Sequence, residues 1–192
     1  GRGPGAKRRG GRAGTGAPIF CGHKAMTVPK TITGPATHIQ AQQMDDLFLQ
    51  ELEEHAVLMA RDVGHILNDH FSQPLTVRYK SKGERNPVTE ADHRADEYLK
   101  EAIARRFPGH GMLTEESGEV GVTTSDFLWV LDPLDGTTNF INRFPFYASS
   151  ISVLYHGAPV VGSIYVASPL HRDETVFHAR HGGGAWANDE RI

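Results

Sequence analysis

Apolar residues recur at three- and four-residue steps after Asp45. This spacing predicts a long amphipathic helix whose buried face carries Phe48, Leu52, Ala56, Met59, Val63 and Leu67. Gln73-Pro74 ends this helix, because proline cannot continue the backbone hydrogen bonds. A second helix is predicted to begin near Thr89 and to stop at Phe107-Pro108-Gly109, with Ala95, Leu99, Ala102 and Ile103 on its apolar face.

Segments of strand length follow the two helices. Gly111–Thr114 predicts a short strand that ends on Glu115-Glu116, and the apolar run Phe127–Leu131 is typical of a strand covered on both faces, ending at Asp132-Pro133. The segments ISVLY, VVGSIYV and TVFHA, separated by turns, predict an antiparallel meander. Two helices followed by a mostly antiparallel sheet predict an α/β fold, an α+β layered sandwich.

Residues 1–44 differ from the rest in composition. They are rich in Gly, Pro, Arg and Thr, which predicts a disordered basic leader before a domain at 45–192. The leader holds seven of the 20 Lys and Arg residues and no acid, so residues 45–192 carry 13 basic against 23 acidic residues. An acidic domain argues against a nucleic-acid surface, where a basic face is expected.

Two further observations concern the compartment. The lone cysteine, Cys21, excludes an internal disulfide and fits a reducing cytoplasm. No segment approaches the roughly 18 consecutive apolar residues of a membrane span. We therefore expect a cytoplasmic protein without a membrane partner.

The most distinctive chemical motif is Asp132–Gly136 (DPLDG), at the expected end of the buried strand. Ligand sites gather at strand ends in sheets covered by helices. Two carboxylates three residues apart across a tight turn can converge on one hard cation, and Mg²⁺ prefers oxygen ligands of this type. The same residues are ordinary turn formers, so the motif taken alone fits a structural turn equally well.

Two weaker acidic motifs precede it. Glu115-Glu116 ends a predicted strand, and because adjacent side chains on an extended backbone point to opposite sides, one glutamate would face a metal and the other would contact the groups around the metal ligands or solvent. Thr89 and Asp92 match a capping box, although a carboxylate at a helix start is also placed to accept a proton from water. Taken singly, these motifs favour a charged loop and a helix cap.

The histidines and the triple glycine indicate no metal or nucleotide site. His178 and His181 are three residues apart, but Gly182–Gly184 follows, which indicates a strand and a turn instead of a zinc-binding helix. The glycines also lack the Gly-Lys-Ser/Thr ending of a nucleotide-binding loop. We therefore expect the histidines to be structural.

In combination, the three acidic motifs resemble the inositol monophosphatase family, since they occur in the family's order and separations. The resemblance continues through Asn142–Phe146 and Gly184–Asn188, and covers roughly residues 45 to 192. It implies the αβαβα fold of inositol monophosphatase and fructose-1,6-bisphosphatase. The family's carboxy-terminal α/β unit, which contains a Trp-Asp motif, is not found here, so we expect only the amino-terminal metal-binding part of that fold.

The resemblance implies a metal-ligand set. Glu115, Asp132 and the main-chain carbonyl of Leu134 match the ligands of one metal ion. Asp132 would also bridge to a second ion, which Asp135 binds. Two or three Mg²⁺ ions and inhibition by Li⁺ are implied.

The resemblance also implies catalytic roles. Thr137 with Asp92 matches the pair that orients and deprotonates the attacking water, with Glu115 in the same catalytic group. The backbone amides at Gly136, Thr137 and Thr138 match the site that holds the transferred phosphoryl group. A family lysine upstream of Asp92 matches Lys80, with Lys82 as the alternative.

The implied reaction is hydrolysis of inositol monophosphates to inositol and phosphate by metal-activated water. Related sugar bisphosphatases, 3'-nucleotidases and histidinol-phosphate phosphatases share these motifs, and a noncatalytic fragment or pseudoenzyme is the alternative from another class. The expected partner is a small phosphate monoester, with a homodimer for the full-length protein. Because the Trp-Asp aspartate completes the second metal site in the family, we expect the 192-residue chain to bind metal weakly and to turn over little.

Overall fold

The structure is a computed structural model that describes residues 45–74, 89–122, 124–168 and 174–192, and the backbone alone of 18–21, 24–27, 77–79 and 87–88. Most of the predicted leader, Lys80 and Lys82 lie outside the described residues, so the predictions for them stay predictions. The elements are, in chain order, β1 (Pro18–Cys21), β2 (Lys24–Thr27), α2 (Asp46–Phe71), β3 (Val77–Tyr79), β4 (Pro87–Thr89), α3 (Glu90–Arg106), β5 (Gly111–Thr114), β6 (Gly118–Gly121), β7 (Phe127–Asp135), α4 (Thr137–Ile141), β8 (Tyr147–Tyr155), β9 (Ala158–Ala167), β10 (Thr175–Arg180), β11 (Gly184–Ala187) and β12 (Glu190–Arg191).

Eight of the strands form one sheet, in the order β12-β11-β10-β9-β8-β7-β5-β6. Every neighbouring pair in it is antiparallel except β5 and β7, which are parallel. The parallel pair is possible because the chain leaves β5 through β6 and returns to the other side of β5 as β7. The predicted, mostly antiparallel sheet is confirmed, and β1–β2 and β3–β4 form two separate antiparallel pairs.

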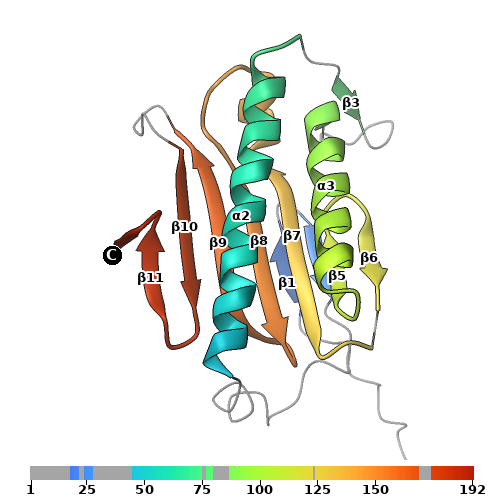
Figure 1. Cartoon of the computed structure of the whole chain (residues 1–192). Coiled ribbons are helices and arrows are strands. Elements are labelled where there is room, and N and C mark those ends of the chain that lie inside the picture. Colours follow the sequence, from blue (N-terminus) through green and yellow to red (C-terminus); the bar gives the residue numbers. More distant parts are fainter. Residues whose placement is uncertain are drawn as a thin grey trace, which may run out of the picture.

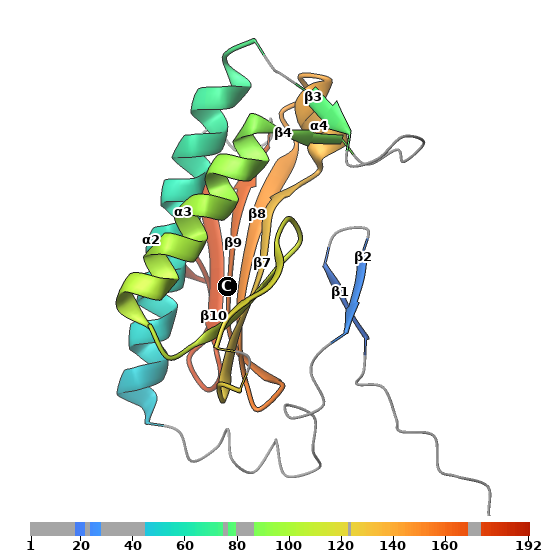
Figure 2. The same cartoon turned by 90° about the vertical axis from the view of Figure 1, so that its right-hand side faces the viewer.

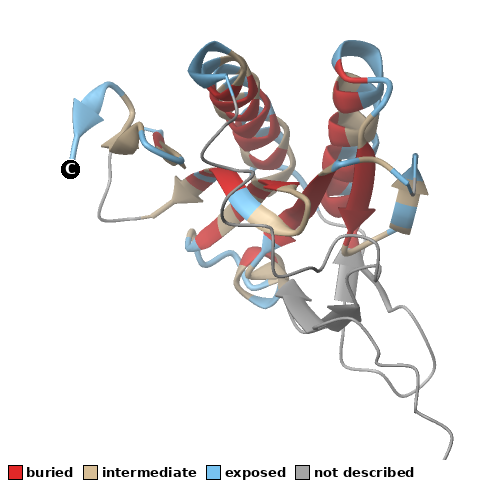
Figure 3. Cartoon of the chain, turned by 90° about the horizontal axis from the view of Figure 1, so that it is seen from below, coloured by how far each residue is buried: buried red, intermediate tan, exposed pale blue. Residues whose placement is uncertain are grey.

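Helices α2 and α3 lie side by side on one face of this sheet (Figures 1 and 2). Their buried residues form a stripe that faces the strands, as Figure 3 shows from one end. The α2 stripe includes the predicted apolar positions from Leu52 to Leu67, and Asp45 caps the helix by accepting the Leu47 N–H at 3.1 Å. None of the helices in the described ranges combines the length and the low polarity that a bilayer-crossing segment requires.

Strand β7 is the centre of the core and is buried on both faces, as predicted. Trp129 and Leu131 belong to the large cluster under the helices, whereas Leu128 and Val130 belong to a second cluster with Leu113 and Leu154. The predicted end of this strand was wrong, because β7 continues to Asp135. Pro133 has no N–H to donate, so the ladder with β8 breaks after Asp132 and resumes where Asp135 pairs with Ala148.

Candidate functional site

The parallel pairing of β5 and β7 places Glu115 beside Asp132. In this register Thr114 is the partner of Leu131, so the next residue of each strand follows at the same edge of the sheet. The Glu115 N–H donates to the Leu131 carbonyl at 3.1 Å and fixes the start of the turn after β5 onto β7. Two acidic residues 17 positions apart in the sequence therefore meet because of strand register.

The Asp132 carboxyl lies in a crowded acidic environment. Its residue is only 4% exposed, and Oδ1 has no hydrogen-bond partner. Its pKa is raised to about 8, first by burial and then by the negative charges of Glu115 and Asp135, followed by a hydrogen bond with the Glu115 side chain and by the charge of Asp92. Positive charge placed among these groups would favour the ionised form, because an opposite charge reverses the direction of such a shift.

These donors fit Mg²⁺ by chemical type, since they are hard carboxylate and carbonyl oxygens. Across the described ranges, however, no three His, Cys, Asp or Glu side chains are grouped closely enough to enclose an ion. Mg²⁺ does not require an enclosing group, because it keeps several water ligands and is commonly held by one or two carboxylates together with substrate phosphate. The arrangement around Asp132 fits that open mode of binding.

Asp92 stands at the start of α3 and is held by Thr89. Its Oδ2 accepts the Thr89 N–H at 2.7 Å and the Thr89 hydroxyl at 2.6 Å, while Thr89 Oγ1 accepts the Ala91 and Asp92 N–H groups in return. The predicted capping box is confirmed. Burial raises the pKa of Asp92 to about 6, although the Thr89 hydrogen bonds lower it, and the charge of Glu116 adds to the rise.

Glu115 and Glu116 act on different carboxylates of the site, although they do not lie on an extended strand as the prediction assumed. They lie in the turn between β5 and β6, where the backbone is no longer extended, so the two-residue periodicity of a strand does not apply. The charge of Glu115 acts on Asp132 and the charge of Glu116 acts on Asp92. Both glutamates therefore belong to the same acidic region.

The end of β7 turns directly into the short helix α4. Gly136 adopts φ of +83°, and a Cβ there would lie 3.1 Å from the Phe146 carbonyl oxygen, so the turn requires glycine. The Thr137 hydroxyl donates to the Leu134 carbonyl at 3.0 Å. Among the described residues it forms no direct hydrogen bond with Asp92, its predicted catalytic partner. Helix α4 nevertheless lies against β4, which leads into Asp92 (Figure 2).

A polar cluster that the sequence interpretation missed lies behind the two glutamates. Asp96, Lys100 and Ser117 hydrogen-bond to one another between α3 and the turn after β5. The sequence does contain a signal for it, because Asp92 and Asp96 interrupt the apolar stripe of the second helix at helical spacing. A carboxylate on a buried helix face requires a polar partner.

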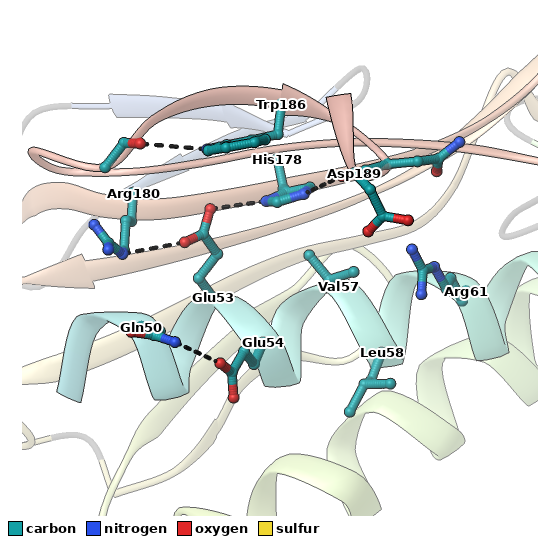
Figure 4. A pocket seen from close by; sticks show the side chains of 12 residues that line it. Gln50, Glu53, Glu54, Val57, Leu58, Arg61, His178, Arg180, Trp186 and Asp189 are labelled. Carbon is teal, nitrogen blue, oxygen red and sulfur yellow. Dashed lines mark hydrogen bonds and ion pairs between the residues drawn. The ribbon is translucent and has the colours of Figure 1, made fainter. Parts of the chain in front are cut away.

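A separate cleft is lined by none of the predicted site residues. It has a volume of about 560 Å³ and runs between α2 and the strands β10 and β11, with the turn after β11 (Figure 4). Glu53 Oε1 hydrogen-bonds to His178 Nδ1 at 2.8 Å, and Glu53 Oε2 forms an ion pair with Arg180 Nε at 3.2 Å. His178 Nε2 also contacts the Asn188 carbonyl at 2.9 Å, so this histidine joins three elements.

Comparison with known proteins places this architecture in a family. The sequence model described as the inositol monophosphatase family matches residues 48–192. The Nus factor SuhB of Escherichia coli is 39% identical over 137 residues, which is 71% of this chain and 50% of that protein. The chloroplastic phosphatase IMPL1 of Arabidopsis thaliana is 36% identical over 143 residues, which is 73% of this chain and 38% of that protein.

A solved structure agrees with these relatives. The inositol monophosphatase from Anabaena superposes with a TM-score of 0.61 at 35% identity, covering 75% of this chain and 49% of the other. The chain thus spans half or less of the length of these matched proteins. The family match extends from α2 to the last residue, and so includes every acidic residue of the candidate site. This chain belongs to the inositol monophosphatase family.

Proposed function

We propose that this chain provides the metal-binding and water-activating part of a magnesium-dependent phosphomonoesterase that acts on inositol monophosphates. The observation that carries the proposal is the Asp132 carboxyl, which is buried among acidic neighbours with one oxygen unbonded. An arrangement of this kind is costly without a cation. Family membership supports a phosphatase of this superfamily.

The residues proposed to hold the ions are Glu115, Asp132, Asp135 and the carbonyl of Leu134. Mg²⁺, when bound, supplies positive charge that stabilises the attacking and the leaving oxygen of an in-line displacement. The Leu134 carbonyl accepts the Thr137 hydroxyl and retains a second lone pair for an ion. The Ser149 hydroxyl donates to the Asp132 carbonyl at 3.2 Å and helps to fix the strand that carries the central carboxylate.

Asp92 is proposed as the general base, with Thr137 orienting the water. A pKa of about 6 leaves Asp92 mainly ionised at neutral pH and makes it a stronger base than an ordinary carboxylate. Both Thr89 hydrogen bonds go to Oδ2, so Oδ1 is the atom that takes the proton. Because Thr137 donates its own proton to Leu134, its oxygen can accept a hydrogen bond from the same water.

The start of α4 is proposed to hold the phosphoryl group through the amides of Gly136, Thr137 and Thr138. The first N–H groups of a helix have no acceptor within the helix, so they are available to anionic oxygens. Gly136 is the N-cap of α4 and has no side chain to cap the helix, so within the described residues it leaves these donors without a side-chain cap.

The proposed inositol specificity is supported by the family resemblance and by Phe144–Phe146, a segment that lies shortly after α4. Phe144 and Phe146 are exposed, with ring centroids 6.3 Å apart, and are placed to border a substrate near the phosphate site. Sugar bisphosphates, nucleotide 3'-phosphates and histidinol phosphate stay the alternative substrates. A cytoplasmic location, a homodimer, Li⁺ inhibition and the absence of a nucleic-acid partner stay predictions.

The test measures phosphate release from each of these monoesters. It compares the complete protein, expressed from the full reading frame, with the 192-residue chain. We expect magnesium-dependent release, fastest with inositol monophosphate, from the complete protein, and loss of turnover in its Asp92→Asn variant. Release that persists in EDTA would contradict the proposal. So would a complete protein that binds Mg²⁺ but hydrolyses none of the panel.

A further inference from the structure

The polar cluster behind the acidic site is closely connected. Ser117 Oγ donates to Asp96 Oδ2 at 2.6 Å, and Lys100 Nζ lies 2.7 Å from the same oxygen and 2.8 Å from Ser117 Oγ. Asp96 is only 3% exposed, whereas the Lys100 side chain is 25% exposed and reaches in from the rim. Three short contacts thus link helix α3 to the turn between β5 and β6.

This turn is the segment that carries Glu115. Its first residue is fixed to β7 by the hydrogen bond from the Glu115 N–H to the Leu131 carbonyl, and its last residue donates from the Ser117 N–H to Thr114 Oγ1 at 2.8 Å. The Ser117 hydroxyl adds the link to Asp96 on the helix. The turn is thereby held by the preceding strand, by the neighbouring strand and by α3.

Helix α3 presents its functional groups in one line. Asp92, Asp96 and Lys100 are spaced four residues apart, so they lie one above another on a single helix face. The first is the proposed base, the second binds the turn, and the third neutralises the second. One rigid helix therefore sets the position of the proposed base and of the turn that carries a proposed metal ligand.

Stability alone does not account for a buried carboxylate at Asp96. Burying a charge is costly even when it is paired, and an apolar contact of similar size would attach the turn without that cost. In addition, Asp96 Oδ1 is buried without a hydrogen-bond partner. A short hydrogen bond to Ser117, in contrast, fixes the direction of the turn, which is what a metal ligand requires from its surroundings.

We propose that Asp96, acting through Ser117 and neutralised by Lys100, is a positioning residue that sets Glu115 against Asp132 for divalent-cation binding. The inference rests on the proposed function, because it assumes that Glu115 and Asp132 share an ion. Asp96 itself does not contact the ion. Its effect passes through Ser117 and the backbone of the turn.

The experiment measures Mn²⁺ binding to the 192-residue chain by the EPR signal of free Mn²⁺, with thermal unfolding of each variant in EDTA alongside. Ser117→Ala and Asp96→Asn are expected to weaken Mn²⁺ binding by about tenfold, the lower end of what loss of a supporting hydrogen bond costs at metal sites. Ser117→Thr keeps the hydroxyl and is expected to retain affinity within about twofold. Tyr98→Phe is the matched control, since it removes another hydrogen bond of α3, to Asp62, that does not reach the turn.

The outcomes separate the two proposals. A wild-type chain that binds no Mn²⁺ would overturn the proposed metal site and this inference with it. Normal wild-type binding together with unchanged affinity in folded Ser117→Ala or Asp96→Asn would overturn the positioning role alone. The positioning role would also be overturned if Tyr98→Phe weakened binding as much as Ser117→Ala, because general loosening of α3 would then explain the loss.

Discussion

Replacing Asp132 by asparagine should stabilise the metal-free chain and remove its response to Mg²⁺. In the fold the pKa of Asp132 is about 8, whereas the pKa of a free aspartate carboxyl is 3.8. A carboxyl whose pKa is raised in the fold favours the folded state most strongly at low pH, and this contribution is lost as pH rises from about 4 to about 8. Asparagine keeps the shape and carries no charge, so it avoids that loss.

The magnitude follows from the same two values. At pH 7 the difference between them corresponds to at most about 4 kcal/mol of destabilisation, and relaxation of Glu115 and Asp135 around the site reduces it to about 2 kcal/mol. We therefore expect Asp132→Asn to raise the free energy of unfolding in EDTA at pH 7 by about 2 kcal/mol, and by little at pH 4. Asp69→Asn, at an exposed aspartate of α2, should change it at neither pH.

The assay is urea unfolding at both pH values in EDTA, and at pH 7 in saturating MgCl₂. Mg²⁺ should stabilise the wild type, because a ligand that binds only the folded state adds to its stability, and it should leave Asp132→Asn unchanged. Equal stability of the two proteins in EDTA at pH 7 would contradict the raised pKa of Asp132. Equal stabilisation of both by Mg²⁺ would contradict its role as a metal ligand.

Three further predictions concern the core that supports the site. His110 accepts the Trp129 indole N–H at 3.0 Å, and burial lowers the pKa of His110 to about 4, so its contribution to folding stability is complete above about pH 6.5 and is lost as the pH falls toward 4. His110→Phe should therefore reduce the decline in unfolding free energy between pH 6.5 and pH 4 by about 1 kcal/mol. An unchanged decline would contradict this. Gly64→Ala should lower the free energy of unfolding in urea by about 1 to 2 kcal/mol, because the added Cβ would lie 2.2 Å from the Tyr165 ring. A Cβ added at Gly109 meets nothing within 4 Å, so Gly109→Ala should leave the stability unchanged. Glu53→Ala should cost about 2 kcal/mol in the same assay, because it leaves His178 without a carboxylate partner and Arg180 with Asp46 alone. The exposed neighbour Glu54→Ala should cost under about 0.5 kcal/mol.

The sequence predicts the helices and β7 well because their signals are local. Periodic apolar residues define α2 and α3, and the uninterrupted apolar run at 127–131 correctly indicates a strand buried on both faces. The end of β7 was missed for an equally local reason, since Asp132-Pro133 is typical of a strand exit. Pairing of Asp135 with Ala148 of β8 continues the strand, and no residue pattern within Asp132–Gly136 predicts this pairing.

The geometry of the candidate site depends on contacts between distant segments, which local sequence patterns do not predict. The acidic motifs are visible in the sequence, but the proximity of Glu115 to Asp132 depends on β5 and β7 being parallel neighbours, which is a property of the sheet order. The turn that brings Glu116 toward Asp92 likewise follows from the β5–β6 hairpin. Asp96 was overlooked because its partner, Ser117, lies 21 residues away in the sequence and meets it only in the fold.

The proposed function depends on Glu115, Asp132 and Asp135 sharing divalent cations at the edge of the sheet. The most direct measurement is an anomalous difference map from crystals of this chain grown with Mn²⁺ in place of Mg²⁺. We expect a peak within about 2.3 Å of an Asp132 carboxylate oxygen, with Glu115 or Asp135 as a further ligand. A well-ordered site that holds no Mn²⁺ at saturating concentration, or ions bound only away from Asp132, would contradict it.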